Sequence, residues 1–429
     1  MLDIRLIREN PELVKNNLKK RGDPGNLKML DGLIDCDRKW RQYLTDLNNL
    51  RHARRQVTSK IAEAKKKGTD ASSEMLKAKE VDGKITKIEK QVTEAEEKVH
   101  EYLMRLPNLL HETVPLGKDE SENVEIRRWG DVPKFAFPIK DHIDIGLNLS
   151  IVDIERAGKI AGARFFYLRR DAVLLDMALI NFALEEMAKK GYTPTEPPFL
   201  MRRKPYEGVV ALSDFEDVLY KVQDEDLYLI ATSEHPMAAM FMDEVLKAED
   251  LPLKLVGVSA NFRKEAGSHG KDTRGIFRTH QFNKVEQFVF SRPEDSWTIH
   301  EELIRNAEEL VQKLGLAYRV VNVCTGDMGT VAAKRYDIEA WMPAQNAYRE
   351  VISCSNDTDY QARRLNIKYR EKEGASPKGF VHTLNSTALA TGRTIVAIIE
   401  NYQQKDGSVV VPEALRKYMG GIKKIVAKR

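Results

Sequence analysis

Two apolar seams with heptad spacing constrain this chain more than any other feature of its sequence. Between residues 33 and 106, apolar side chains recur at alternating steps of three and four. The first seam consists of Leu33, Cys36, Trp40, Tyr43, Leu47, Leu50, Arg54, Val57, Ile61 and Ala64, and only Arg54 is polar. The second consists of Ala78, Val81, Ile85, Ile88, Val92, Ala95, Val99, Tyr102 and Leu106. A repeat of about 3.5 residues winds helices into a left-handed coiled coil, so two long packed helices are predicted.

The segment between the two seams, residues 67–73, has the composition of a turn. It contains Gly68, and both Asp70 and Ser73 are residue types suited to cap the helix that follows. Pro107 ends the second helix, because proline cannot donate the next helical hydrogen bond. We therefore predict an antiparallel helical hairpin formed within one chain.

The hairpin carries its positive charge close to its turn. Residues 51–79 hold nine Lys or Arg side chains and three acidic ones, whereas residues 80–106 hold five basic and seven acidic ones. The formal net charge of the whole chain is only +4. A dimerisation coiled coil or a spacer is the alternative, but a basic tip favours contact with nucleic-acid phosphates. The side chains expected to make this contact are Arg51, Arg54, Arg55, Lys60, Lys65, Lys66 and Lys67.

Other sequence features exclude several classes of protein. No apolar run approaches the roughly 18 residues of a membrane span, and the N-terminus lacks the apolar stretch of a signal peptide. The three cysteines, Cys36, Cys324 and Cys354, form no disulfide framework and argue against a cysteine-rich zinc site. The chain has neither GxxxxGK[ST] nor a GxGxxG that opens a helix. We expect a cytoplasmic protein with no membrane partner.

From residue 107 onward the pattern changes from heptads to a mixture of helices and strands. Residues 107–170 contain four prolines and are predicted to be a connector, and a helix is predicted at 172–189. Strands are predicted at 226–232, 254–261, 280–290, 317–323 and 347–353. Many strands with little regular βαβ alternation predict an α+β fold, an antiparallel sheet flanked by helices.

Fixed charges accompany two of the predicted strands. Arg263 and Glu265 are two residues apart and share one strand face, and a guanidinium suits phosphate or carboxylate. On the return strand, one face is formed by Phe282, Lys284, Glu286, Phe288 and Phe290. Charges among aromatic rings are costly to bury without partners, so this face indicates a ligand pocket. A surface strand with a chance ion pair is the alternative.

Three further polar segments lie at the ends of predicted elements. Residues 232–234, Thr-Ser-Glu, precede a helix predicted at 236–246, where Thr and Glu are also common caps. The other two are residues 349–356 and 385–393. Arg393 lies near a predicted helix start, where a cation opposes the helix dipole unless an anion is bound.

In this order, the segments resemble the motifs of class II aminoacyl-tRNA synthetases. Residues at about 191–200, including Pro198, resemble motif 1, those at about 258–290 resemble motif 2, and those at about 385–404 resemble motif 3. The resemblance is specifically to seryl-tRNA synthetases through Thr232–Glu234, the run 350–364 and the helical arm. It covers nearly the whole chain.

The resemblance implies a tRNA-binding domain at 1–106 and a class II catalytic domain at 107–429. The scarcity of cysteine and the heptad arm indicate the ordinary type of this family and not its zinc-dependent type. Members activate L-serine with ATP to seryl-adenylate and pass the seryl group to the 3′ end of serine tRNA. Whether selenocysteine tRNA is also a substrate is left open. A homodimer formed through motif 1 is implied, with the arm reaching the long variable arm of the tRNA.

Roles for single residues follow from the same resemblance. The expected catalytic residues are Arg263 and Arg393, which would hold phosphates and stabilise charge at phosphorus, and Arg278, which would bind the region of the α-carboxylate and α-phosphate. The residues expected to bind ATP are Arg263, Lys264, Glu265, Phe282, Glu350, Val351, Ile352, Ser353 and Arg393. The residues expected to bind L-serine are Thr232, Ser233, Glu234, Arg263, Glu286 and Thr387. Glu350 and Ser353 are expected to hold Mg²⁺.

Two questions stay open at the level of sequence. Strict strand alternation puts Glu350 and Ser353 on opposite faces, so a shared metal would need a bend or bulge between them. The alternatives to a serine–tRNA ligase are a non-catalytic tRNA-binding paralogue and an enzyme that loads a carrier protein. The first is disfavoured because Arg263, Glu286 and Arg393 are all present, and the second because of the basic arm.

Overall fold

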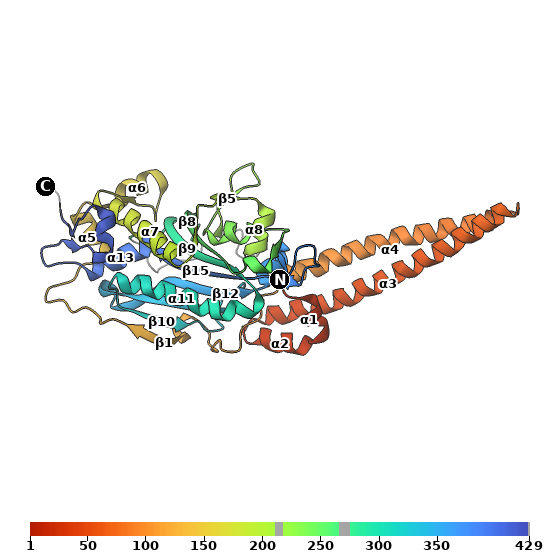
Figure 1. The fold of residues 1–429 in the computed structure, drawn as a ribbon, viewed down its shortest axis with the longest axis horizontal. Coiled ribbons are helices and arrows are strands. Elements are labelled where there is room, and N and C mark those ends of the chain that lie inside the picture. The colour runs from red at the N-terminus through yellow and green to blue at the C-terminus, as the bar shows by residue number, and fades with distance from the viewer. Residues whose placement is uncertain (211–217, 266–274, 428–429) are drawn as a thin grey trace. The chain divides into compact units, whose positions relative to one another are not determined.

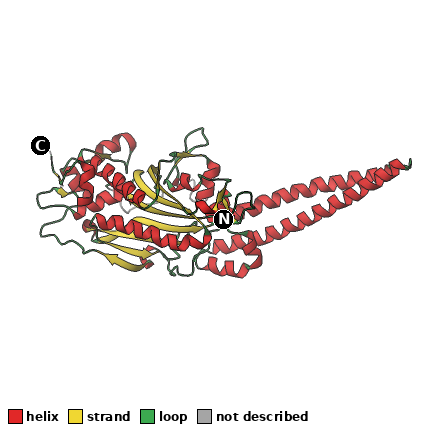
Figure 2. Ribbon diagram, viewed as in Figure 1, coloured by secondary structure: helices red, strands yellow, loops and turns green. Residues whose placement is uncertain are grey.

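The structure is a computed structural model that describes residues 1–210, 218–265 and 275–427. Its contacts divide the chain into two units, Met1–Pro107 and Asn108–Arg429. Figure 1 follows the chain through both units, and Figure 2 shows that the first contains helices only. None of the helices in the described ranges is both long and apolar enough to cross a membrane.

The first unit is the predicted helical hairpin with two short helices before it. Its elements are α1 (Ile4–Glu9), α2 (Pro11–Lys19), α3 (Pro24–Lys66) and α4 (Ser72–Arg105). The helix α3 begins well before the predicted seam, because Pro24 is suited to a first helical position and the Asp23 carboxylate accepts from the backbone of Gly25. At the turn, the carboxylate of Asp70 accepts from the backbone amide of Ser72 over 3.0 Å.

Two cross-helix ion pairs explain the polar position in the first seam. Arg54 Nε lies 2.6 Å from Asp82 Oδ1, and Arg51 Nη2 lies 2.8 Å from Glu89 Oε1. Both arginines belong to α3 and both acids to α4, so the pairs join the two helices of the hairpin. The remaining arm residues expected to meet RNA are exposed, namely Arg55, Lys60, Lys65, Lys66 and Lys67.

The second unit is built on an eight-stranded sheet with the order β1-β10-β11-β12-β15-β9-β8-β4. All neighbours in it are antiparallel except β4 and β8. Its strands are β1 (Val124–Trp129), β4 (Thr193–Thr195), β8 (Leu253–Phe262), β9 (Gln281–Ser291), β10 (Tyr318–Asn322), β11 (Lys334–Met342), β12 (Ala347–Thr358) and β15 (His382–Ala390). The predicted α+β class with a mainly antiparallel sheet is confirmed.

Smaller sheets and helices surround this sheet. The short strands are β2 (Val152–Asp153), β3 (Tyr167–Leu168), β5 (Leu200–Met201), β6 (Tyr228–Leu229), β7 (Val245–Lys247), β13 (Lys368–Arg370), β14 (Gly379–Phe380), β16 (Val409–Val410) and β17 (Lys424–Ile425). The helices are α5 (His142–Asn148), α6 (Ile154–Ala161), α7 (Asp171–Lys189), α8 (Arg203–Val209), α10 (Glu234–Ala238), α11 (Ser296–Lys313), α12 (Tyr360–Leu365), α13 (Thr391–Asn401) and α14 (Glu413–Arg416).

The two faces of the sheet bury different cores. Val285 and Val289 of β9 join a core with α7, α11 and α13, whereas Phe288 and Phe290 join a second core with α8, α10 and α12. The alternation predicted for this strand is therefore observed, and Lys284 and Glu286 lie on the Phe288 side.

The prediction of a helix at 236–246 was wrong. The helix α10 ends at Ala238, and Val245–Lys247 instead form β7, which pairs in parallel with β13. Asp243, between them, adopts a positive φ of 63°, which a continuous helix does not allow. Pairing with a strand more than a hundred residues away overrode the local helical pattern.

Candidate active site

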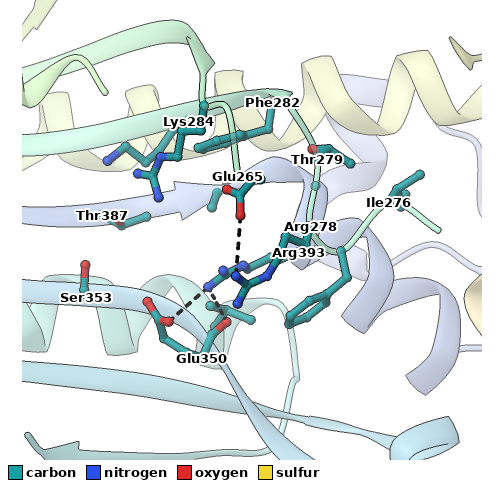
Figure 3. Close-up of a pocket in the computed structure, with 15 residues that line it drawn as sticks. Glu265, Ile276, Arg278, Thr279, Phe282, Lys284, Glu350, Ser353, Thr387 and Arg393 are labelled. Carbon is teal, nitrogen blue, oxygen red and sulfur yellow. Dashed lines mark hydrogen bonds and ion pairs between the residues drawn. The ribbon is translucent and has the colours of Figure 1, made fainter. Parts of the chain in front are cut away.

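A pocket lies where the ends of β8, β9, β12 and β15 meet the start of α13 (Figure 3). Its walls are formed by Arg263, Glu265, Ile276, Phe277, Arg278, Thr279, Phe282, Lys284, Glu350, Val351, Ser353, Thr387, Ala390, Gly392 and Arg393. The structure thus brings together residues of the motif 2-like segment, the segment 349–356 and the motif 3-like segment, whereas the motif 1-like segment at 191–200 contributes none of the lining residues. Residues 266–274 of the motif 2 segment lie outside the described residues.

A β-bulge in β12 puts Glu350 and Ser353 into the same pocket. Ser353 pairs with Asp337 and Ile352 with Ile338, but the next partner, Glu339, pairs with Glu350. Val351 is therefore the extra residue, and it changes the face of every later side chain. The structure therefore contains the bulge that a metal shared by Glu350 and Ser353 would need.

Arg393, in the first turn of α13, forms an ion pair with Glu350. Its Nη1 lies 3.2 Å from Glu350 Oε2 and donates to the backbone oxygen of Glu350 over 2.9 Å. Its guanidinium also lies 5.1 Å from the centre of the Phe277 ring. Burial alone would raise the pKa of Glu350, but the charges of Arg393 and Arg335 lower it to about 2. Glu350 is thus an ionised carboxylate that faces the pocket at any ordinary pH.

Arg263 and Phe282 form a second charged and aromatic wall. The guanidinium of Arg263 lies 5.1 Å from the centre of the Phe282 ring, and its Nε donates to the backbone oxygen of Ala231 over 3.3 Å. Beside them, Arg278 Nη1 donates to Glu265 Oε2 over 3.4 Å. Glu265 adopts a positive φ of 50°, an uncommon conformation that turns the chain at the pocket edge. An anionic ligand and a flat ring fit between these walls.

Glu286 and Thr387 are direct cross-strand partners, and Thr387 lines the pocket with Glu286 buried behind it. Thr387 Oγ1 donates to Glu286 Oε2 over 3.2 Å, and Lys284 Nζ lies 2.5 Å from the same oxygen. A bulge at Ala388 follows, since Thr387 pairs with Glu286 but Leu389 pairs with Val285. Burial raises the pKa of Glu286, against the opposing effect of Lys284. A buried acceptor of this kind suits a ligand hydroxyl.

A second cavity continues from the pocket past Arg263 and Ser353, which line both. Thr232 and Glu234 lie in its wall, and the Thr232 hydroxyl accepts from the backbone amide of Glu234 over 3.1 Å. Gln361 donates to Glu234 Oε1 over 3.1 Å. Burial, together with the charge of Glu286, raises the pKa of Glu234 to about 7. The negative charges of Glu234 and Glu286 therefore repel each other, and a ligand ammonium bound here would neutralise them.

Four of the expected residues do not line either cavity, and one of them, Glu286, reaches the pocket wall only through its hydrogen bond with Thr387. Ile352 packs into the core beneath the sheet, because the bulge at Val351 leaves it on the opposite face. Lys264 follows the end of β8, and its backbone amide donates to the backbone oxygen of Val218. Ser233 is fully buried, and its hydroxyl donates to the oxygen of Gly257 over 3.5 Å.

Other lining residues received no individual role from the sequence, although Lys284 belonged to the strand face predicted to form a ligand pocket. Lys284 is 6% exposed and pairs with Glu286, and Phe277 supports two arginines, Arg349 at 4.7 Å and Arg393. Asp357 is buried in the second cavity, where Asn385 donates to it over 3.1 Å. Strand alternation already placed Lys284 on the face of Glu286, so that residue had a usable signal. Phe277 and Asp357 had none, because their neighbours come from distant strands.

The residues expected to hold Mg²⁺ fit that ion. Within residues 1–210, 218–265 and 275–427, no group of three or more His, Cys, Asp or Glu side chains is arranged as a metal site. One ionised carboxylate, Glu350, and one hydroxyl, Ser353, instead share the pocket wall. Magnesium is commonly bound in this way, by one or two carboxylates and the phosphates of its substrate.

Comparisons with known proteins match both units. A family model described as the seryl-tRNA synthetase N-terminal domain matches residues 1–110, and one described as the class II tRNA synthetase core domain (G, H, P, S and T) matches residues 220–402. A serine–tRNA ligase of Methanocella arvoryzae is 53% identical over 98% of this chain and 99% of its own. One from Methanospirillum hungatei is 54% identical with the same coverage.

Solved structures agree with these relatives. The seryl-tRNA synthetase of Pyrococcus horikoshii, complexed with ATP, has a TM-score of 0.96 and 52% identity, with all of both chains covered. The cytoplasmic serine–tRNA ligase of Naegleria fowleri, in complex with AMP, has a TM-score of 0.91 and 36% identity over 100% of this chain and 99% of that one.

Proposed function

Because the chain belongs to the seryl-tRNA synthetases, a family of ATP-dependent ligases, we propose that it joins L-serine to serine tRNA. In the first step, a carboxylate oxygen of serine attacks the α-phosphorus of ATP and pyrophosphate leaves. In the second, a hydroxyl of the terminal adenosine of the tRNA attacks the serine carbonyl carbon and AMP leaves. The observation that carries the proposal is the buried Glu286–Thr387 pair within reach of an arginine-lined pocket.

The phosphates of ATP are the proposed ligands of Arg263, Arg278 and Arg393. Their guanidiniums face one pocket, and fixed cations there stabilise charge that develops at phosphorus without reorganisation. Glu350 and Ser353 would hold Mg²⁺, which supplies additional positive charge at the phosphates. Glu265 and Phe282 would bind the adenine, and the Phe282 ring offers it a face for stacking. No residue is required as a general base, since positioning and charge account for the chemistry.

Serine is the proposed ligand of the region between the two cavities. Its ammonium would lie near Thr232 and Glu234, and its hydroxyl would bind Glu286 and Thr387. Alanine would leave the buried Glu286 carboxylate without this partner, which makes rejection of alanine strong. Arg263 would lie between the carboxylate of serine and the α-phosphate.

Transfer RNA is the proposed partner of the first unit, residues 1–106. The exposed cations Arg55, Lys60 and Lys65–Lys67 near its turn support this role. Arg51 and Arg54 are paired with acids of α4, so their part is to join the hairpin helices as well as to add positive charge.

We also propose a homodimer and a cytoplasmic location. On α7, which precedes the motif 1 strand, Val173, Leu174 and Met177 are 42%, 43% and 48% exposed on one side of the helix. A second subunit would cover this apolar surface. The non-catalytic paralogue is not supported, because the relatives are named as ligases and every phosphate-facing arginine is present.

Serine-dependent exchange of labelled pyrophosphate into ATP tests the activity directly. We expect exchange with serine and at least about a hundredfold less with alanine or glycine, since a buried acceptor is then left unpaired. Exchange that requires a different amino acid would contradict the specificity. Binding of tRNA without any exchange would favour the non-catalytic alternative.

A further inference from the structure

A buried histidine–carboxylate pair lies outside the pocket, and neither member has a role so far. Glu400 belongs to the last turns of α13, and its side chain is 1% exposed. His142, the first residue of α5, is 7% exposed, and its Nδ1 lies 2.9 Å from Glu400 Oε1. The backbone amide of His142 donates to the same oxygen over 3.2 Å.

The second ring nitrogen of His142 reaches the segment that forms the pocket wall. Its Nε2 lies 3.4 Å from the backbone nitrogen of Ile276. A backbone N–H can only donate, so Nε2 must be the acceptor. Nδ1 then carries the ring hydrogen and donates it to Glu400. Glu400 therefore selects the tautomer that can bind Ile276.

Ile276 begins the part of the motif 2 segment that contacts the proposed ATP. Phe277 and Arg278 follow it directly, and all three line the pocket. Phe277 is the ring beneath Arg349 and Arg393, and Arg278 binds Glu265. A shift of Ile276 would consequently move an aromatic support and a cation of the pocket together.

Gly275 shows how closely His142 approaches this segment. The φ of Gly275 is +86°, and a Cβ built there would lie 2.2 Å from His142 Nε2. Glycine is required at this position both by its backbone conformation and by the nearby ring. The imidazole therefore packs directly against the backbone that it binds.

Glu400 holds a third segment with its other oxygen. Oε2 accepts from the backbone amide of Ala344, in the 3₁₀ turn Pro343–Gln345 that leads into β12. Arg349 and Glu350 lie a few residues further along this strand. One buried carboxylate thus joins α13, which carries Arg393, to the segments that carry Arg278 and Arg349.

We propose that His142 and Glu400 are positioning residues for the ATP half of the active site. Resting on the function proposed above, the inference is that they set the Ile276–Arg278 segment relative to Arg393 and thereby control affinity for ATP but not for serine. The serine-facing residues Thr232, Glu234, Glu286 and Thr387 make none of the contacts of this pair.

Two substitutions of one residue separate the two hydrogen bonds of the imidazole. In His142→Asn, the side-chain amide lies near the position of Nδ1, so the bond to Glu400 is kept and the acceptor for Ile276 is lost. In His142→Gln, the amide lies near Nε2, so the acceptor for Ile276 is kept. We expect His142→Asn to raise the KM and the Kd for ATP about five- to tenfold, with the serine KM within about twofold. His142→Gln should restore most of the affinity for ATP.

His382→Ala is the matched control. His382 also makes a side-chain hydrogen bond, 2.8 Å to Ser296 Oγ, but it does not line the pocket. It should lower the melting temperature and leave the ATP KM unchanged. Wild-type ATP affinity in His142→Asn, or an equal loss for ATP and serine, would overturn the inference.

A measurement on the unaltered protein covers the case in which the His142 variants do not fold. Hydrogen exchange of the peptide that contains Ile276 should be slow without ligand, because its amide is already bound to Nε2. Exchange at the rate of an unstructured peptide would refute the bond. If the wild-type protein shows no serine-dependent exchange of pyrophosphate into ATP, the proposed function fails. If this pyrophosphate exchange is normal and the His142→Asn variant keeps the wild-type affinity for ATP, only the positioning role is rejected.

Discussion

Thr387 lies directly opposite Glu286 on the neighbouring strand, and its hydroxyl donates to Oε2 of that carboxylate over 3.2 Å. The same oxygen lies 2.5 Å from Lys284 Nζ. Among the described residues, both contacts use this one oxygen of the buried carboxylate, and the other oxygen is the proposed acceptor for a ligand hydroxyl. This arrangement is the physical basis for the proposed choice of serine.

Glu286→Gln should weaken serine binding far more than ATP binding. The substitution keeps the shape of the side chain but removes its negative charge. A hydrogen bond to a charged acceptor contributes about 1.5–3 kcal/mol. We expect the serine Kd to rise about 10- to 100-fold by calorimetry, with the ATP Kd within about threefold.

Two substitutions of Thr387 are the control for this prediction. Thr387→Ser retains the hydroxyl and should bind serine with nearly unchanged affinity, whereas Thr387→Val should weaken it. An unaltered serine Kd in Glu286→Gln would be incompatible with the proposed contact.

Serine affinity should fall as the pH is lowered through neutrality. Burial raises the pKa of Glu234 to about 7, so the empty site loses this negative charge below that pH. The ammonium of serine stays protonated in this range, so its binding favours the ionised carboxylate. Between pH 8 and pH 6, the serine KM should therefore rise up to about tenfold.

Glu234→Gln should flatten this pH profile and weaken binding at pH 8. Asp176→Asn is the comparison, because burial also raises the pKa of Asp176 but the residue lies on α7, away from Glu234. Its serine profile should match that of the unaltered protein. A profile that persists in Glu234→Gln would assign the titration to another group.

Glu350→Gln should increase the requirement for Mg²⁺. Arg393 and Arg335 keep Glu350 ionised, and its amide would be a neutral and weaker ligand. We expect the Mg²⁺ concentration for half-maximal exchange to rise at least about tenfold, which is about 1.4 kcal/mol. Ser353→Ala should have a smaller effect of the same sign. If Mg²⁺ titrations of the two variants and the wild type coincide, neither residue holds the ion.

Replacing Lys65, Lys66 and Lys67 by Gln should weaken tRNA charging and leave adenylate formation unchanged. These exposed side chains lie in the arm, and each phosphate contact contributes about one unit to the salt dependence of binding. The tRNA KM should rise, and the slope of log K against log salt should become shallower by about two to three.

The matched variant replaces Lys84, Lys87 and Lys90, which are exposed on α4. It removes the same charge from the acidic half of the hairpin and should affect the tRNA KM much less. Equal effects of the two triple variants would mean that net charge, and not the α3 surface near the turn, determines binding.

Periodicity along the chain was sufficient to predict much of the architecture. Heptad steps predicted α3 and α4 because coiled-coil packing depends only on which residues share a helix face. The alternation of β9 separated Val285 and Val289 from Phe288 and Phe290 for a similar reason, since strand faces repeat every two residues. The ordered motif-like segments identified most of the residues that meet at the two cavities, with Lys264, Ser233, Ile352 and Glu286 as the exceptions.

Register and long-range pairing were decided only by the tertiary structure. The extra residue Val351 brings Glu350 and Ser353 to one wall and turns Ile352 away, and it exists because β11 and β12 change register there. The pairing of Val245–Lys247 with β13 replaced a predicted helix, and Asp82 supplied the partner that makes Arg54 acceptable in an apolar seam. His142 and Glu400 are 258 residues apart. A local sequence pattern records the period of an element, but a bulge, a cross-helix ion pair or a buried side-chain hydrogen bond depends on the partner that folding brings beside it.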